Sequence, residues 1–252
     1  MNPRTLVLLL GLGAVVVAPT AEAAKPVAKL PHKPEAKPVA KPSCANAVRF
    51  TSDALLPLAL VRDGKLEADK GQCPEEFFPK GQKWSAIDRF GKMVGLVENT
   101  TDSSGMHFRV VSGSPGARVF VRGRKAPYAS AAWTPPASEK KKLLTAIGAK
   151  VAREVTFFQA GDRKFGVVTE RSTFSIAERD AKGQWKRRFH EKNFVGFNVF
   201  ALRAIVDMDG DGMPEIVKHF SEDAQGHGFE VVLARKPNGD WHEVASNEDT
   251  GP

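Results

Sequence analysis

Residues 202–217 read Leu-Arg-Ala-Ile-Val-Asp-Met-Asp-Gly-Asp-Gly-Met-Pro-Glu-Ile-Val. Apolar residues stand at both ends of this stretch, and their β-branched members favour two strands. Between them, the carboxylates of Asp207, Asp209, Asp211 and Glu215 occupy positions 1, 3, 5 and 9 of a single short loop. The intervening glycines let the backbone coil tightly enough for these side chains to converge. The stretch therefore predicts a strand–loop–strand unit with an acidic loop.

The acidic loop predicts a calcium site. Carboxylates at this spacing repel one another unless a cation lies among them, and an oxygen-only ligand set suits a hard ion such as Ca²⁺. Gly212 allows a sharp turn at position 6, as in EF-hand loops, but Lys218 occupies position 12, where an EF-hand requires an acidic residue. The alternative is an acidic hairpin turn without a metal. The predicted ligands are the carboxylates of Asp207, Asp209, Asp211 and Glu215 and the backbone carbonyl of Met213.

The pattern Asp-x-Asp-Gly-Asp-Gly-x-x-Glu-Ile-Val of residues 207–217 resembles the β-hairpin calcium loops of FG-GAP and VCBS-type repeats, which occur in integrin alpha-chain propellers. The resemblance extends from Val199 to Ala245 and implies that the five ligands named above bind calcium. The loops of that family close more often with Asp, so Glu215 is a departure. Such repeats serve adhesion, enzymes and structural roles, and the resemblance therefore indicates calcium without indicating an activity.

A weak internal repeat accompanies the loop, because residues 165–185 resemble residues 215–241. Gly183-Gln-Trp185 aligns with Gly239-Asp-Trp241, and each copy predicts two or three strands with a Gly-x-Trp hairpin exit, as in propeller blades. In the first copy the acidic loop is reduced to residues 160–162, so only the second copy is expected to bind metal. Two copies are too few for a closed propeller.

The first 43 residues predict a targeting segment and a linker. Residues 1–23 combine Arg4, a short apolar run and a small-x-small site, which predicts a secretory signal peptide cleaved after Ala23. The apolar run is shorter than the roughly 20 residues of a membrane-spanning helix. Residues 24–43 repeat Lys and Pro, which predicts an extended spacer. The spacer is either a cationic tether to an anionic cell envelope or a solvated linker without a partner.

The remaining sequence predicts two mainly β units. Residues 44–135 contain short apolar runs separated by turn signals such as Asp63-Gly64, and the pair Cys44 and Cys73 predicts one disulfide in a secreted protein. Residues 136–252 begin with a helix, for which Ser138 is the predicted N-cap and Leu143, Ile147 and Val151 form an apolar face. The β repeats and the calcium loop follow. The predicted fold is thus all-β with one helix.

Several charged groups have both a binding and a solvated interpretation. Residues 185–190 (Trp-Lys-Arg-Arg-Phe-His) alternate bases with aromatic rings, and Arg122, Arg124 and Lys125 form a second cluster. Both would have to lie on one face to bind a polyanion; otherwise they are the solvated sides of strands. The run Lys140–Lys142 is interpreted as the solvated face of the helix. His219, Glu222, Asp223 and His227 match no metal or hydrolase spacing and are expected in a solvated loop.

These observations predict a secreted or periplasmic calcium-binding β protein that acts as a binding or structural module at the cell envelope. The sequence does not identify a partner; an anionic envelope component and a protein are the two candidates. A net charge of +8 over 252 residues is too mild to indicate nucleic acid by itself, and no second long apolar run predicts a membrane span. Common nucleophile and phosphate-loop motifs are missing from the sequence, so a non-catalytic role is favoured. A calcium-dependent extracellular hydrolase and a polyanion-binding module remain the alternatives.

Overall fold

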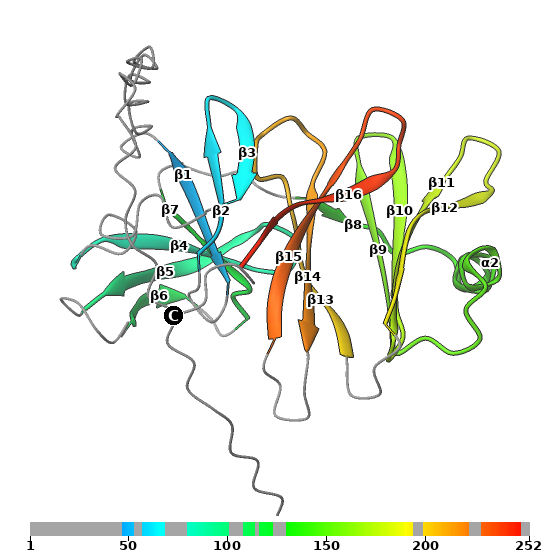
Figure 1. Cartoon of the computed structure of the whole chain (residues 1–252), viewed down its shortest axis with the longest axis horizontal. Helices are drawn as coiled ribbons and strands as arrows, with labels where there is room; N and C mark the ends of the chain where they lie inside the picture. Colours follow the sequence, from blue (N-terminus) through cyan, green and yellow to red (C-terminus); the bar gives the residue numbers. More distant parts are fainter. Residues whose placement is uncertain are drawn as a thin grey trace, which may run out of the picture. The chain divides into compact units, whose positions relative to one another are not determined.

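Three antiparallel sheets and one helix make up the regular structure of the described residues (Figure 1). The computed structural model describes residues 47–52, 57–68, 80–100, 108–113, 116–122, 130–193, 199–221 and 228–247. The predicted all-β fold with one helix is confirmed within these ranges. The predicted signal peptide, the linker and the Cys44–Cys73 disulfide lie outside them.

The first sheet has seven strands in the order β3-β2-β1-β7-β4-β5-β6. The predicted hairpin at Asp63-Gly64 is confirmed: both residues have positive φ (51° and 72°), the backbone that a two-residue hairpin turn requires. At the β4–β5 turn, Asp88 Oδ1 accepts hydrogen bonds from the backbone N–H groups of Phe90 and Lys92 at 2.9 Å each. The strands are β1 (Val48–Ser52), β2 (Pro57–Arg62), β3 (Lys65–Ala68), β4 (Lys83–Ile87), β5 (Met93–Asn99), β6 (Phe108–Gly113) and β7 (Val119–Arg122).

The other two sheets are each built around four strands that follow one another in sequence. The second sheet has the order β12-β11-β10-β9-β8, and the third has the order β13-β14-β15-β16. The second sheet comprises β8 (Ala131–Ala132), β9 (Glu154–Ala160), β10 (Arg163–Thr169), β11 (Thr173–Arg179) and β12 (Trp185–Lys192). The third comprises β13 (Val199–Val206), β14 (Glu215–Ser221), β15 (Gly228–Arg235) and β16 (Trp241–Ser246).

Strand register makes these two meanders equivalent position by position. One row of paired residues crosses β9 to β12 (Phe157, Gly166, Ala177, Arg187), and a matching row crosses β13 to β16 (Ile205, Ile216, Leu233, Glu243). In both sheets the pairing of the last two strands skips one residue, Arg188 or Val244, which is the third residue after the tryptophan. The shared bulge adds a structural likeness to the sequence likeness of the two segments.

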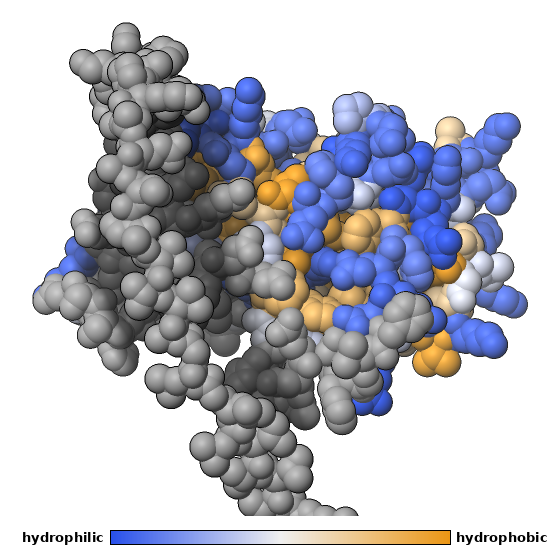
Figure 2. Space-filling model, viewed as in Figure 1, coloured by the Kyte–Doolittle hydropathy of each residue, from blue (hydrophilic) through white to orange (hydrophobic). Residues whose placement is uncertain are grey.

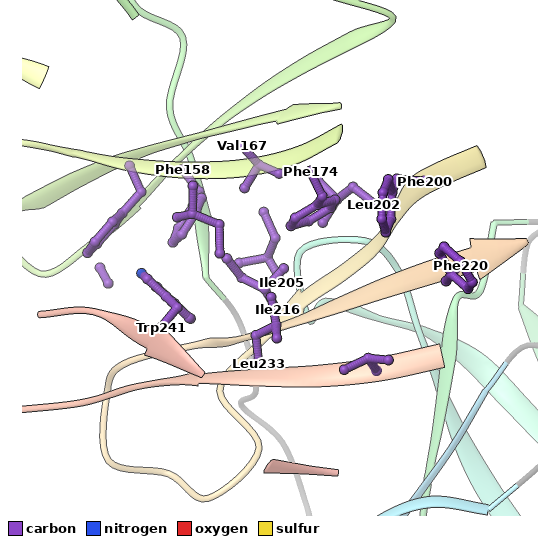
Figure 3. Packing of buried hydrophobic residues seen from close by; sticks show 14 residues of the cluster. Phe158, Val167, Phe174, Phe200, Leu202, Ile205, Ile216, Phe220, Leu233 and Trp241 are labelled. Atoms are coloured by element: carbon purple, nitrogen blue, oxygen red, sulfur yellow. The ribbon is translucent and has the colours of Figure 1, made fainter. Parts of the chain in front are cut away.

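A large apolar core fills the space between the second and third sheets (Figure 3). Alternate residues of most strands face it, as the two-residue period of a strand requires. In β13 the bulge at Arg203 makes Ile205 the next core residue after Leu202. The stacked rings of Phe158 and Phe165 have centroids 4.8 Å apart, and Trp241 meets Phe165 edge-on at 6.1 Å. From β9–β11 come Phe158, Phe165, Val167, Phe174 and Ile176; from β13–β16 come Phe200, Leu202, Ile205, Ile216, Phe220, Val231, Leu233 and Trp241.

The opposite face of the third sheet packs against the first sheet. This second core joins Phe50, Leu58, Val61, Ile87, Val119 and Val121 to Ala204, Val206, Met208, Val217, Val232 and Ala245. The third sheet is therefore a middle layer that is covered on both faces, and its apolar residues alternate between two cores. Strand β8 of the second sheet precedes the predicted boundary at residue 135, and residues from both sides of that boundary share this core.

Helix α2 (Ala137–Ile147) covers the outer face of the second sheet, where Leu143 and Ile147 pack against Val168, Ala177 and Trp185. The helix ends at Gly148, whose φ of 76° is easily adopted only by glycine. Two details of the predicted helix are wrong. Pro136 is the N-cap residue and makes no side-chain cap, so Ser138 lies inside the first turn. Val151 lies beyond the helix and is 77% exposed, because the glycine stop ends the apolar stripe at Ile147.

In the view of Figure 2, hydrophilic residues cover much of the described surface, and hydrophobic residues show between them. None of the helices in the described ranges has the length and apolar character that crossing a membrane requires.

Two buried carboxylates tie the layers together in the same way. Glu139 of α2 accepts hydrogen bonds from Arg179 Nε (2.9 Å), Trp185 Nε1 (3.0 Å) and Lys142 Nζ (2.8 Å). The hydrogen bond from Lys142 is the largest cause that lowers the pKa of Glu139. One layer further on, Glu178 of β11 accepts hydrogen bonds from Arg163, Arg188 and Arg235, at 2.8, 3.0 and 3.1 Å.

Arg179 and Arg235 occupy equivalent positions, since each is the partner of the tryptophan that begins the last strand of its meander. Arg179 thus links the second sheet to α2, and Arg235 links the third sheet to the second, each by donating to a carboxylate of the other layer. Burial raises the pKa of Glu178, but the hydrogen bond and charge of Arg235 and the other arginines outweigh burial, and the net pKa is lowered.

We predict that Glu178→Gln lowers the free energy of unfolding by about 3 kcal/mol at pH 7, because it leaves the partly buried guanidinium groups of Arg188 and Arg235 without their counter-charge. Since the folded pKa of Glu178 lies below its unfolded value, this stability is present above about pH 4.5 and is lost as the pH falls. Urea denaturation at pH 7 and pH 3.5 measures both effects. The exposed pair partner Glu67 provides the control variant Glu67→Gln, which should change stability by less than about 1 kcal/mol. Equal effects of the two variants would contradict the prediction.

We also predict that Gly166 sets the distance between α2 and its sheet. A Cβ at this position would lie 2.4 Å from Leu143 Cδ2, and Leu143 is fully buried. Gly166→Ala should therefore cost about 1–3 kcal/mol by overpacking, and Leu143→Ala about 2–5 kcal/mol by leaving a cavity. The double variant should lose less than the sum, because the new methyl group enters the cavity. Additive losses in a double-mutant cycle would show that the two positions do not contact each other.

Candidate metal centre

The acidic loop connects β13 to β14 in the middle layer, and both of its ends are held by the core. At its start, Val206 and Met208 are fully buried in the core shared with the first sheet. At its end, Ile216 is buried in the core shared with the second sheet. Gly210 and Gly212 adopt φ of 81° and 86°. Side chains other than glycine are strained there, which explains why both positions are glycine.

The carboxylates of the loop organise its backbone. Asp207 accepts hydrogen bonds from the N–H groups of Gly210 (2.8 Å) and Gly212 (3.1 Å), one on each oxygen. Asp209 Oδ1 accepts from Asp211 N at 3.1 Å, and Asp211 Oδ1 accepts from Met213 N at 2.6 Å. These local bonds are the side-chain turns that Asp favours. They fix the conformation of the loop and leave Asp207 and Asp209 partly buried, whereas Asp211 is exposed.

Three carboxylates converge. One oxygen each of Asp207, Asp209 and Glu215 lies within 4.8 Å of the other two. Glu215 is the first residue of β14 and is only 4% exposed, whereas the two aspartates are partly buried. Glu215 Oε2 accepts a hydrogen bond from Met208 N at 2.7 Å, which orients the carboxylate toward the loop. This group holds only carboxylate oxygens, and an oxygen donor set fits a hard divalent cation.

The electrostatics of the triad favour a cation. Burial raises the pKa of Glu215 to about 9, and the negative charges of Asp209, Asp211 and Asp207 add to this effect. Burial also raises the pKa of Asp209, with Asp211 and Asp207 again adding to it. A buried carboxyl group beside two others keeps its proton unless a positive charge compensates it. A bound cation would therefore displace the proton of Glu215 and pair with the resulting carboxylate.

The structure brings together three of the five predicted ligands. Asp211 is outside the group of converging oxygens, although its charge acts on Glu215 and Asp209. Met213 donates its backbone N–H to Asp211, and its side chain packs against the core between the second and third sheets. Metal ligation by all five residues stays a prediction.

The equivalent turn of the second sheet has no such site. Register places Gln159 where the third sheet has Asp207, and Phe165 where it has Glu215. The Gln159 side chain donates to Gly161 O at 2.9 Å, and Phe165 is buried in the core. The prediction that only the second copy carries the acidic loop agrees with this pairing.

One charged group that the sequence placed in a solvated loop lies elsewhere. His219 is in β14, its side chain is 15% exposed, and Nδ1 is 3.9 Å from Glu230 Oε1. The prediction was wrong because β14 continues to Ser221. Residues 222–227, which include Glu222, Asp223 and His227, are outside the described ranges, as are Arg124 and Lys125. The sequence analysis did not predict the buried Glu230, which accepts a hydrogen bond from Asn247 Nδ2. Only its position in an alternating strand pattern could have indicated that its side chain is buried.

We predict that Glu215→Gln stabilises the metal-free protein at neutral and alkaline pH. The folded pKa of about 9 exceeds the unfolded value near 4.5, so stability is present below pH 4.5 and is lost as the pH rises toward 9. At pH 7 the loss is on the order of 3 kcal/mol. Gln removes this loss and keeps an oxygen for the Met208 N–H. Urea denaturation in EDTA should show an advantage of the variant at pH 8 that disappears at pH 4; a difference independent of pH would contradict this account.

Comparison with known proteins identified no relative: no family model, no curated protein and no solved structure matches the chain.

Proposed function

We propose that the loop of residues 207–215 binds Ca²⁺ and that the chain is a calcium-stabilised, non-catalytic binding or structural module. The observation that carries this proposal is the convergence of Asp207, Asp209 and Glu215 on one point, with Glu215 buried and its pKa raised. Such an arrangement costs free energy in the absence of a cation. A bound divalent ion turns the same arrangement into a favourable one.

The donor set favours calcium over other metals. Zinc sites use Cys and His, and the triad contains neither. Magnesium demands a near-ideal octahedron and keeps several waters, whereas calcium accepts six to eight oxygens in flexible geometry. Three carboxylates can supply up to six oxygens, and backbone carbonyls or water can complete the shell. The resemblance of the loop to FG-GAP and VCBS-type repeats supports the same ion.

A structural role follows from where the loop lies. It joins β13 to β14, and these two strands contribute to both apolar cores. An ion held between Asp207, which follows β13, and Glu215, which begins β14, would clamp the end of this hairpin. With calcium at ten times its Kd, the folded state would gain about 1.4 kcal/mol. That gain is a modest but useful share of the stability of a typical domain.

The proposed place of action is the cell envelope or the exterior. The signal-like residues 1–23 and the Lys/Pro-rich residues 24–43 support it. Calcium outside the cytosol is abundant enough to saturate sites with Kd of about 10⁻⁴–10⁻³ M. An anionic envelope component or another protein is the proposed partner.

We predict that calcium at ten times its Kd raises the Tm of chelator-treated protein by about 3–6 °C, and that Asp209→Asn abolishes the shift. The matched control is Asp162→Asn, because Asp162 is an exposed aspartate in the equivalent turn of the second sheet. The control should keep the full shift. Differential scanning calorimetry with CaCl₂ and with MgCl₂ measures the effect.

Two outcomes would overturn the proposal. The wild-type protein would show no heat in calorimetric titration with millimolar CaCl₂, or the Asp209→Asn variant would bind as well as the wild type. A larger shift with MgCl₂ than with CaCl₂ would reassign the ion. The non-catalytic role is tested separately by a broad hydrolase screen with and without chelator, in which calcium-dependent turnover would refute it.

A further inference from the structure

A groove runs between α2 and the β11–β12 turn, far along the chain from the metal loop. It encloses a cavity of about 490 Å³. One wall is the helix face formed by Ser138, Lys141, Lys142, Thr145 and Ala146, and the other wall is Gly183, Gln184 and Trp185. The packing of Leu143 directly over Gly166 brings the helix close enough to the sheet for these walls to face each other.

The rim of the groove is positively charged. Lys141 and Lys142 line the groove on the helix, and Lys182 is exposed in the β11–β12 turn next to the lining residue Gly183. Arg187 is exposed on β12 and donates a hydrogen bond to Ile147 O at 3.4 Å, at the end of the helix. The run at 140–142, interpreted from sequence as a solvated helix face, thus lies beside part of the basic segment 185–190. These two basic segments are more than 40 residues apart in the chain, and the contact between α2 and β12 brings them together.

The acidic groups near the groove are already engaged. Glu139 is buried and accepts from Lys142, Arg179 and Trp185. Asp180 Oδ1 accepts a 2.7 Å hydrogen bond from Gln184 N within the turn. Glu139 compensates the charge of Lys142, but no carboxylate is among the lining residues of the groove. An anionic ligand would therefore meet a favourable potential from Lys141 and from the basic residues beside the turn.

The apolar surface of the groove limits the kind of anion. The Trp185 ring is 9% exposed, because it packs between Trp133 (6.2 Å between centroids) and Phe157 (5.8 Å). Nucleobases bind single-stranded nucleic-acid sites by stacking on open aromatic faces, and Trp185 offers little of its face. The ring edge, Ala146 and the aliphatic stems of the lysines instead form a narrow apolar strip between charges.

From this geometry we propose that the groove binds an anionic oligosaccharide, whose sulfate or carboxylate groups pair with the lysines while a sugar ring lies along the strip. Thr145, Ser138 and Gln184 provide polar groups for ring hydroxyls. The proposal is independent of the calcium loop, since none of the groove residues belongs to residues 207–215.

The test uses a heparin-derived octasaccharide as the probe, with calorimetric titration at 50 and 150 mM NaCl. The triple variant Lys141→Gln/Lys182→Gln/Arg187→Gln should weaken binding by about tenfold, since each exposed charge contributes modestly. The matched control Lys65→Gln/Lys83→Gln/Lys236→Gln removes the same charge from exposed positions elsewhere. It should change the Kd by less than about threefold. Equal losses would show that only net charge matters and would overturn the proposal.

A second variant tests the groove itself. Ala146→Phe fills the cavity without changing charge and should weaken binding by at least about tenfold, while an unchanged Tm shows that α2 stays in place. Wild-type affinity in this variant would overturn the site. An octameric oligodeoxythymidylate that binds as tightly as the octasaccharide would overturn the carbohydrate assignment. Asp209→Asn should bind the octasaccharide normally, so a failure of the calcium proposal is distinguishable from a failure of this one.

Discussion

Burial of the β13–β16 sheet on both faces is the constraint on which the rest of the structure depends. Its strands send alternate residues into two different cores, toward Phe50 and Val119 on one side and toward Phe158 and Phe174 on the other. Each fully buried Phe, Leu or Ile contributes roughly 1.5–3 kcal/mol, so the two cores supply most of the stabilisation. A shift of one residue in the register of β14 would exchange its two faces. The acidic loop therefore belongs to the hairpin whose register matters most, and a cation there would hold that register at its end.

The two meanders stack in the same sense. The tryptophan face of the second sheet is covered by α2, and the tryptophan face of the third sheet is covered by the second sheet. Each of these two layer boundaries carries a buried glutamate that accepts a hydrogen bond from an arginine of the next layer, Glu139 from Arg179 and Glu178 from Arg235. Helix α2 thus occupies the position that a preceding meander would take. The first sheet covers the other end. The same helix, in closing the stack, forms one wall of the basic groove.

Sequence patterns predicted the local elements and the acidic loop, but not how the layers meet. The alternation and turn residues were sufficient for the hairpin at Asp63-Gly64 and for the strands beside Asp207 and Glu215. The convergence of Glu215 with the aspartates depends on its burial at the start of β14, which only the packing of the middle layer reveals. His219 was misplaced because its glycine-rich neighbours suggested a loop. The groove between Lys141 and the β11–β12 turn depends on Gly166, because the helix can approach the sheet this closely only where the sheet lacks a side chain.

The connectivity of the strands has a consequence for the order of folding. In β9–β12 and in β13–β16, each strand pairs with the strand that follows it in sequence. These strand pairs close only short loops, so they can form early in folding. In the first sheet, β1 pairs with β7, and Arg49 is opposite Arg122. That pairing closes a much longer loop and bears a larger entropic cost. The middle sheet can therefore act as a template that is complete on one side before β1 and β7 meet across the other. Refolding kinetics should accordingly be governed by the assembly of the N-terminal sheet.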